Sequence, residues 1–119
     1  MRVLIVDDSE MIRVRIAKLL ERIRGVQVVG QAIDGDQGIE LASRLQPDLI
    51  VLDLVMRRTS GYDVLCQVKR AMPNMKVAML TNYADTYWRD KCTQAGADYF
   101  LDKSTQFDLL VSACAELAA

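Results

Sequence analysis

Three aspartates and one lysine are the residues of this sequence whose types and positions could do chemistry. Asp7 and Asp8 directly follow an apolar run, Asp53 directly follows a second run, and Lys103 follows a third after one intervening residue. If these runs are parallel strands, the four charged groups meet at one edge of one sheet. Two like charges about 4 Å apart repel by roughly 4 kcal/mol at an effective dielectric constant near 20. A cation must therefore offset the carboxylates, and a ligand set made only of oxygen atoms favours a hard ion such as Mg²⁺.

Two hydrophobic patterns alternate along the chain and predict the elements that position these residues. Short apolar runs rich in Val, Ile and Leu are typical of strands buried on both faces. They lie at 3–6, 26–29, 49–52, 77–80 and 99–101. Helical spacing predicts helices from the N-cap Ser9 to Gly25 and then at about 36–45, 61–71, 84–95 and 105–117. Five strand-then-helix units with short connections predict an α/β fold, a doubly wound (βα)5 sandwich around one parallel sheet.

Size and composition predict a single domain over residues 1–119. The net charge of −1 with 26% charged residues provides no bulk attraction to nucleic acid or anionic lipid. No apolar run approaches membrane-spanning length and the amino terminus enters a strand at once, so we expect a cytoplasmic protein without membrane or direct nucleic-acid contacts. Cys66, Cys92 and Cys114 lie far apart in helical patterns, which indicates reduced packing residues.

The polar residues at the strand ends are more informative together than singly. In an open doubly wound sheet, ligands bind outside the carboxyl ends of the strands, where the strand order reverses. Asp7, Asp8, Asp53, Thr81 and Lys103 all follow predicted strands. An aspartate there is often only a helix N-cap, and a threonine is often only a turn residue. Their joint placement favours a shared site.

This set of residues resembles the signature of the receiver domain of two-component response regulators, over essentially the whole chain. The matching residues are the Asp7–Asp8 pair, Asp53, Gly61 eight residues later, Thr81, and Phe100 three residues ahead of Lys103. The resemblance implies a flavodoxin-like, five-stranded parallel sheet in the order 2-1-3-4-5. It also implies an aspartate that accepts a phosphoryl group from a partner histidine kinase or histidine phosphotransfer protein.

The resemblance assigns a role to each residue of the acid site. Asp53 would be the phosphoacceptor, Asp8 a direct Mg²⁺ ligand and Asp7 a ligand through water. The backbone carbonyl of Val55 would complete the protein's share of the coordination, and Mn²⁺ could substitute for Mg²⁺. A carboxylate is a weak nucleophile toward a negatively charged phosphoryl group, so Mg²⁺ and Lys103 would supply alignment and charge neutralisation.

Thr81 and Phe100 are the positions at which the resemblance places a switch. The Thr81 hydroxyl can reach the phosphoryl group only by rotating inward. In the family this opens space for the aromatic residue at the Phe100 position, and the face formed by the fourth helix, fifth strand and fifth helix is remodelled. Phe100 has no hydroxyl, so its response would come from packing, the alternative being a permanent core residue. The expected output is an altered contact with an output domain, a downstream protein or a second copy in a homodimer.

The sequence also departs from the family pattern. Arg57 and Arg58 stand where the family usually has a proline, so this loop loses a rigid turn and gains two cations. Asn82 is bulkier than the Ala or Gly that the family favours after the switch threonine. Ser104 replaces the proline that often follows the lysine, and a non-proline cis bond costs roughly 2.5–4 kcal/mol, so a trans Lys103–Ser104 bond is the energetic default.

Two surface features have simpler interpretations. The first predicted helix carries the basic residues Arg13, Arg15, Lys18, Arg22 and Arg24. Because no aromatic residues interleave with them, we interpret this as a solvated polar face. Trp88 shares a helical stripe with core positions, whereas Tyr87 is the better candidate for a contact surface.

Two other functions remain open. A pseudo-receiver would be a constitutive binding module, which the intact Asp53, Thr81 and Lys103 argue against. A small α/β enzyme acting on phosphorylated or nucleotide substrates would need a phosphate site, and no glycine-rich phosphate loop is present. We therefore predict a phosphorylation-controlled signalling switch rather than an enzyme. Failure to label with a small phosphodonor would favour the binding module, and turnover of a free substrate would favour the enzyme.

Overall fold

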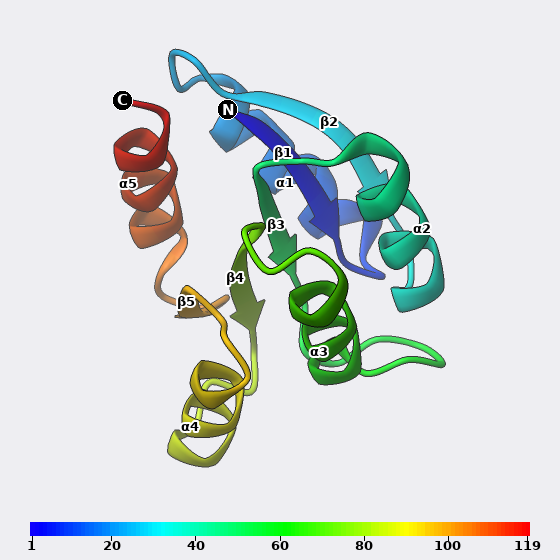
Figure 1. Ribbon diagram of the computed structural model, residues 1–119. Helices are drawn as coiled ribbons and strands as arrows, with labels where there is room; N and C mark the ends of the chain where they lie inside the picture. The colour runs from blue at the N-terminus through cyan, green and yellow to red at the C-terminus, as the bar shows by residue number, and fades with distance from the viewer.

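The computed structural model describes residues 1–119 as one parallel sheet covered by helices on both faces (Figure 1). The strands are Arg2–Val6 (β1), Gln27–Ala32 (β2), Leu49–Leu52 (β3), Lys76–Thr81 (β4) and Tyr99–Asp102 (β5). The helices are Glu10–Glu21 (α1), Gly35–Leu45 (α2), Gly61–Ala71 (α3), Thr86–Gln94 (α4) and Phe107–Ala118 (α5). Every strand pair is parallel and the order is β2-β1-β3-β4-β5, which confirms the predicted fold class and strand order.

The sheet separates two hydrophobic cores because successive side chains of a strand point to opposite faces. On one face, Val3 and Ile5 of β1 pack with Ile16 and Leu20 of α1 and with Leu110 of α5. On the other face, Leu4 and Val6 of β1 pack against side chains of α2, α3 and α4. Helices on both faces require strands that are apolar on both sides, which explains the continuous runs seen in the sequence.

Three predicted helix ends are wrong, and local hydrogen bonds explain two of them. The fourth helix begins at Thr86 rather than at 84, because the Asp85 side chain accepts a hydrogen bond from the Trp88 amide at 2.9 Å and caps the first turn. The fifth begins at Phe107 rather than at 105, because residues 103–105 form a turn that two hydrogen bonds close, the Gln106 amide donating to the Asp102 carbonyl and the Gln106 side-chain oxygen accepting from the Asp102 amide, each at 2.8 Å.

The first helix begins as predicted but ends early. Ser9 is its N-cap, as predicted, and accepts a hydrogen bond from the Ile12 amide. The regular helix stops at Glu21 rather than continuing to Gly25. Gly25 instead lies in the turn before β2, with a φ of +85° that favours glycine.

The aromatic residues of α4 lie as the pattern indicated. Trp88 is half-buried against the second core, with ring centroids 6.1 Å from Tyr62 and 5.2 Å from Tyr87. Tyr87 is 62% exposed, so it is available on the surface as predicted. Cys92 and Cys114 are buried within the two cores, which fits their interpretation as packing residues.

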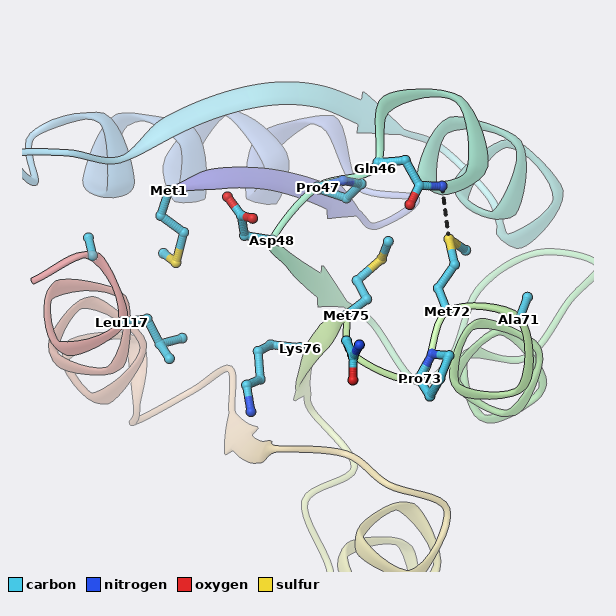
Figure 2. Close-up of a pocket in the computed structure, with 12 residues that line it drawn as sticks. Met1, Gln46, Pro47, Asp48, Ala71, Met72, Pro73, Met75, Lys76 and Leu117 are labelled. Atoms are coloured by element: carbon cyan, nitrogen blue, oxygen red, sulfur yellow. Dashed lines mark hydrogen bonds between the residues drawn. The ribbon is translucent and has the colours of Figure 1, made fainter.

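The largest cavity lies at the amino ends of the central strands, opposite to the end where the charged residues gather. It has a volume of about 680 Å³ and is bounded by Asp48 before β3, Lys76 of β4 and Leu117 of α5 (Figure 2). The Gln46 side-chain amide donates a hydrogen bond to the Met72 sulfur across one wall (Figure 2). This cavity therefore cannot be the site that the acidic residues form. None of the helices is both long enough and apolar enough to cross a bilayer.

Candidate functional site

Asp7, Asp8, Asp53 and Lys103 come together at the carboxyl end of the sheet. The Lys103 ammonium lies 2.6 Å from Asp7 Oδ2 and 3.0 Å from Asp53 Oδ2. One carboxylate oxygen from each aspartate lies within 4.8 Å of the others. Asp7, Asp53 and Lys103 are buried, whereas Asp8 is the most exposed of the four. We call these four residues the acid site, and the sequence placed all of them at one edge correctly.

Backbone hydrogen bonds that continue the sheet ladder hold these residues in place. The Asp53 amide donates to the carbonyl of Val6 at 2.9 Å, one residue beyond the pairing of β1 with β3. The Lys103 amide donates to the carbonyl of Thr81 at 2.9 Å, one residue beyond the pairing of β4 with β5. The backbone of Asp53 and of Lys103 is therefore fixed by hydrogen bonds to the neighbouring strand.

Gly61 allows α3 to begin directly beside the acid site. A Cβ atom at this position would lie 1.9 Å from the Asp53 carbonyl oxygen and 2.7 Å from the Leu54 Cα. The Gly61 amide donates to the Leu54 carbonyl at 2.7 Å, so the loop from β3 closes back onto its own strand end. Only glycine fits there without moving the backbone of Asp53.

The donor set suits a hard divalent cation. The three carboxylates carry three negative charges against the single positive charge of Lys103, so the cluster is formally −2 without a metal. Both Asp7 oxygens already have partners within the protein, Oδ2 at Lys103 and Oδ1 at the Ser9 amide, 2.9 Å away. Asp53 is engaged in the same way, with Oδ2 at Lys103 and Oδ1 accepting from the Val55 amide at 3.4 Å, whereas the Asp8 carboxylate has no hydrogen-bond or ion-pair partner within the protein. Carboxylate oxygens are the donors that Mg²⁺ prefers.

Burial makes Asp53 unusually hard to ionise. Removal from water raises the pKa of its carboxyl to about 6, and Lys103 opposes this while the charge of Asp7 adds to it. Burial alone would lower the pKa of Lys103, but its hydrogen bond to Asp7 and its contact with Asp53 raise it instead. The lysine is therefore a permanent cation beside a carboxylate that is ionised at neutral pH.

Thr81 and Phe100 lie on neighbouring strands beside the acid site. Thr81 is fully buried, and its Oγ1 accepts a hydrogen bond from the Tyr83 amide at 3.0 Å, so the hydroxyl is engaged by the loop before α4. Phe100 is half-buried against the second core, with the Arg89 guanidinium of α4 5.7 Å from its ring centroid. Its ring is thus partly accessible and not enclosed as a wholly buried core residue would be.

The loops around the acid site differ in how they are held. Val55 is 49% exposed and its amide lies 3.4 Å from Asp53 Oδ1. The Lys103–Ser104 peptide bond, which the sequence left open, is trans, the form of lower energy for a non-proline residue. Ser104 donates to the Asp102 carboxylate from its amide at 2.8 Å and from its hydroxyl at 2.6 Å.

Arg13 has a role at this site that the sequence pattern did not reveal. Its guanidinium donates a hydrogen bond to the Asp7 carbonyl oxygen at 2.8 Å, so it is partly anchored and not wholly solvated. Nothing in the composition of α1 separates Arg13 from the other basic residues. Its separation from Asp7 by six residues across the turn into α1 is the only available signal.

Fold and site together define a class, the doubly wound α/β proteins with an acid cluster and a lysine at the carboxyl end of the sheet. Within that class the chain belongs to the response regulator receiver domains, a family that it matches over residues 3–115. It is therefore a signalling domain of the response regulator type, consistent with control by phosphorylation.

Curated relatives support this membership. The chain is 39% identical over 104 residues to the response regulator protein VraR of Staphylococcus saprophyticus, a match that covers 87% of this chain and 50% of VraR. It is 37% identical over 105 residues to the transcriptional regulatory protein LiaR of Bacillus subtilis, covering 88% of this chain and 50% of LiaR. The chain thus spans about half the length of the curated relatives it matches.

Solved structures with the same fold come from the same family. A two-component response regulator of the LuxR family from Aurantimonas sp. superposes with a TM-score of 0.92 at 26% identity, covering 98% of this chain and 84% of that one. The response regulator domain of Thermotoga maritima CheB superposes with a TM-score of 0.87 at 27% identity, covering 99% of this chain and 92% of that one.

Proposed function

We propose that this domain is a phosphorylation-controlled switch in which Asp53 accepts a phosphoryl group from a histidine kinase or a histidine phosphotransfer protein. The observation that carries the proposal is the placement of Asp53 between Asp7, Asp8 and Lys103, with the Lys103 ammonium 3.0 Å from its carboxylate. In this step an Asp53 oxygen forms a bond to phosphorus. The P–N bond of the donor phosphohistidine breaks, and its electron pair returns to the imidazole.

The residues of the acid site would divide the work of this transfer. Asp53 is the nucleophile, and its pKa of about 6 leaves it ionised at neutral pH. Lys103, held by Asp7, presents a fixed ammonium to an oxygen of the transferred group. Asp8, Asp53 and the Val55 carbonyl would hold Mg²⁺, or Mn²⁺ in its place, and Asp7 would contribute through water, as the resemblance to receiver domains implies. Mg²⁺ supplies neutralisation of the phosphoryl and carboxylate charges when bound.

The switch would begin at Thr81. Its hydroxyl is engaged by the Tyr83 amide in this structure, and turning toward a phosphoryl group on Asp53 would break that hydrogen bond. The movement would free space for the half-buried Phe100 ring, which leaves its contact with Arg89. The surface of α4, β5 and α5 would change as a result, and with it the binding of an output region, a downstream protein or a second copy.

Labelling with a small phosphodonor tests the central step. Intact-mass analysis after incubation with acetyl phosphate should show one phosphoryl group per chain, only when Mg²⁺ or Mn²⁺ is present. Asp53→Asn should abolish the added mass. Asp63→Asn, at an exposed position in the first turn of α3, is the matched control and should label normally. Undiminished labelling of Asp53→Asn would refute the assignment, and an unlabelled wild type would favour a constitutive binding module.

A further inference from the structure

A second pocket, lined by arginines, adjoins the acid site. Its volume is about 520 Å³. It is lined by Asp8, Glu10, Arg13, Ile33, Asp34, Arg57 and Arg58. Asp8 belongs both to this pocket and to the carboxylate cluster, so the pocket borders the acid site at Asp8. We call it the arginine pocket.

The arginines of this pocket have no internal charge partner. Every ion pair of the protein is made by a lysine, so none of the three guanidinium groups is neutralised by a carboxylate of the chain. Arg57 and Arg58 are exposed and make no side-chain hydrogen bond, whereas Arg13 is held by the Asp7 carbonyl. Arg58 also has a φ of +69°, a conformation that a residue with a side chain rarely adopts.

The acidic residues of the pocket do not cancel these charges once a cation is bound. Asp8 contributes to the metal cluster, where a divalent ion would compensate its charge. Asp34 caps α2 by accepting from the Gln37 amide at 2.8 Å. Three guanidinium groups then face only Asp34 and Glu10, so the pocket is positive on balance. Guanidinium groups bind oxyanions with paired, directional hydrogen bonds.

We propose that Arg13, Arg57 and Arg58 form an oxyanion-binding subsite that holds the phosphoryl group of the incoming donor before its transfer to Asp53. The inference rests on the proposed function and extends it, because it names the residues that select the donor. The shared ligand chemistry is a phosphoryl group carrying negative charge, whether on an acyl phosphate or on a phosphorus–nitrogen donor. A group bound there lies beside Asp8, whereas the cavity at the amino ends of the strands and a pocket of about 340 Å³ between α2 and α3 are lined by no residue of the acid site.

Labelling kinetics test the subsite. Rates of phosphorylation would be measured against the concentration of acetyl phosphate, and separately of phosphoramidate, for wild type and the double variant Arg57→Gln/Arg58→Gln. The double variant should raise the concentration for half-maximal rate at least about tenfold with both donors, and change the maximal rate less than about twofold. Arg13 is left intact because it contacts Asp7. Arg22→Gln, at the far end of α1, removes one exposed arginine and should leave both quantities unchanged.

A binding measurement separates this inference from the proposed function. With Mg²⁺ and with Asp53 intact, sulfate, which cannot phosphorylate the protein, should bind the arginine pocket by calorimetry, and the Arg57→Gln/Arg58→Gln change should remove the binding. If the wild type is never labelled but sulfate binding depends on the arginines, the subsite stands and the phosphoacceptor role fails. The subsite is overturned if sulfate binds both proteins equally, if Arg22→Gln weakens labelling as much as the double variant, or if only one donor is affected.

Discussion

The two ends of the sheet each carry a cluster of lysine and aspartate, and the charge ratio is reversed between them. At the amino end, Asp98 lies between two lysines, 2.9 Å from Lys69 Nζ and 3.7 Å from Lys76 Nζ. Its carboxylate also accepts a hydrogen bond from the Val77 amide at 2.9 Å. At the carboxyl end, three carboxylates gather around a single lysine, Lys103, which pairs with Asp7 and Asp53.

The pKa values of Asp53 and Asp98 shift in opposite directions, in keeping with the opposite ratios of lysine to aspartate around them. Burial tends to raise the pKa of both Asp53 and Asp98. At Asp98 the Val77 amide and Lys69 outweigh burial, and the pKa falls below its ordinary value. At Asp53 the single lysine, Lys103, does not outweigh the effect of burial, and the pKa of the carboxyl rises to about 6. The amino-end cluster is thus complete within the chain, whereas the carboxyl-end cluster is completed only by a cation from outside.

Removing the lysine should have very different effects at the two ends. Lys103→Met leaves buried carboxylates unpaired and should lower the free energy of unfolding by about 4 kcal/mol without metal. Lys69→Met leaves Asp98 with Lys76 and the Val77 amide, and should cost about 1 kcal/mol. Urea unfolding of both variants in EDTA measures the difference. Equal costs would show that the two clusters are not different in kind.

The pH dependence of the stability of Asp53→Asn should show how much the buried Asp53 carboxylate destabilises the folded protein. Because the folded pKa of about 6 exceeds the ordinary value of 3.8, the folded protein holds the extra proton between these values, and stability falls as pH rises through this interval. The loss is about 3 kcal/mol and persists above pH 6. Asp53→Asn lacks this loss, so its stability relative to wild type should increase between pH 4 and pH 7. A relative stability that does not change with pH would contradict the raised pKa.

Added Mg²⁺ should stabilise the protein through the carboxyl end alone. A cation that binds only the folded state adds about 2.7 kcal/mol at a hundred times its dissociation constant. Wild type should show this gain at matched ionic strength, and Asp8→Asn should show less because it removes a ligand. Asp98→Asn should keep the full gain, since its cluster needs no external ion. Absence of a Mg²⁺-dependent shift in wild type would rule out a cation site.

Asp98→Asn should give the smallest effect, with the opposite pH dependence. Its depressed pKa means that its stabilisation is present above pH 3.8 and lost as pH falls through the folded value. The variant should be about 1 kcal/mol less stable than wild type at pH 7. The gap should narrow on acidification below about pH 4. Denaturant melts at closely spaced pH values would show this trend, and a gap that widens in acid would be inconsistent with a completed ion pair.

Most of the fold could be predicted from local patterns in the sequence. Apolar runs and helical stripes identified the strands and helices, because a strand buried on both faces needs continuous apolar residues. The errors lay at the ends of elements. The second strand, predicted at 26–29, extends to Ala32, and the fourth helix begins at Thr86, where the Asp85 cap decides the first turn. A helix cap depends on a few side-chain hydrogen bonds, which the spacing of apolar residues along the sequence does not reveal.

The order of residues along the chain is enough to place Asp7, Asp53 and Lys103 at one edge of the sheet, because each follows a strand and parallel strands end on the same side. The contacts among them depend on how the strands and helices pack. Lys103 and Asp53 are fifty residues apart in sequence, and their 3.0 Å contact depends on the packing of β5 beside β4. The same holds for the arginine pocket, where Arg13 of α1 and Arg57 of the loop after β3 line one hollow. How deeply a charged side chain is buried, and which charges surround it, depend on the packing of the sheet against the helices. A local sequence pattern does not contain this information.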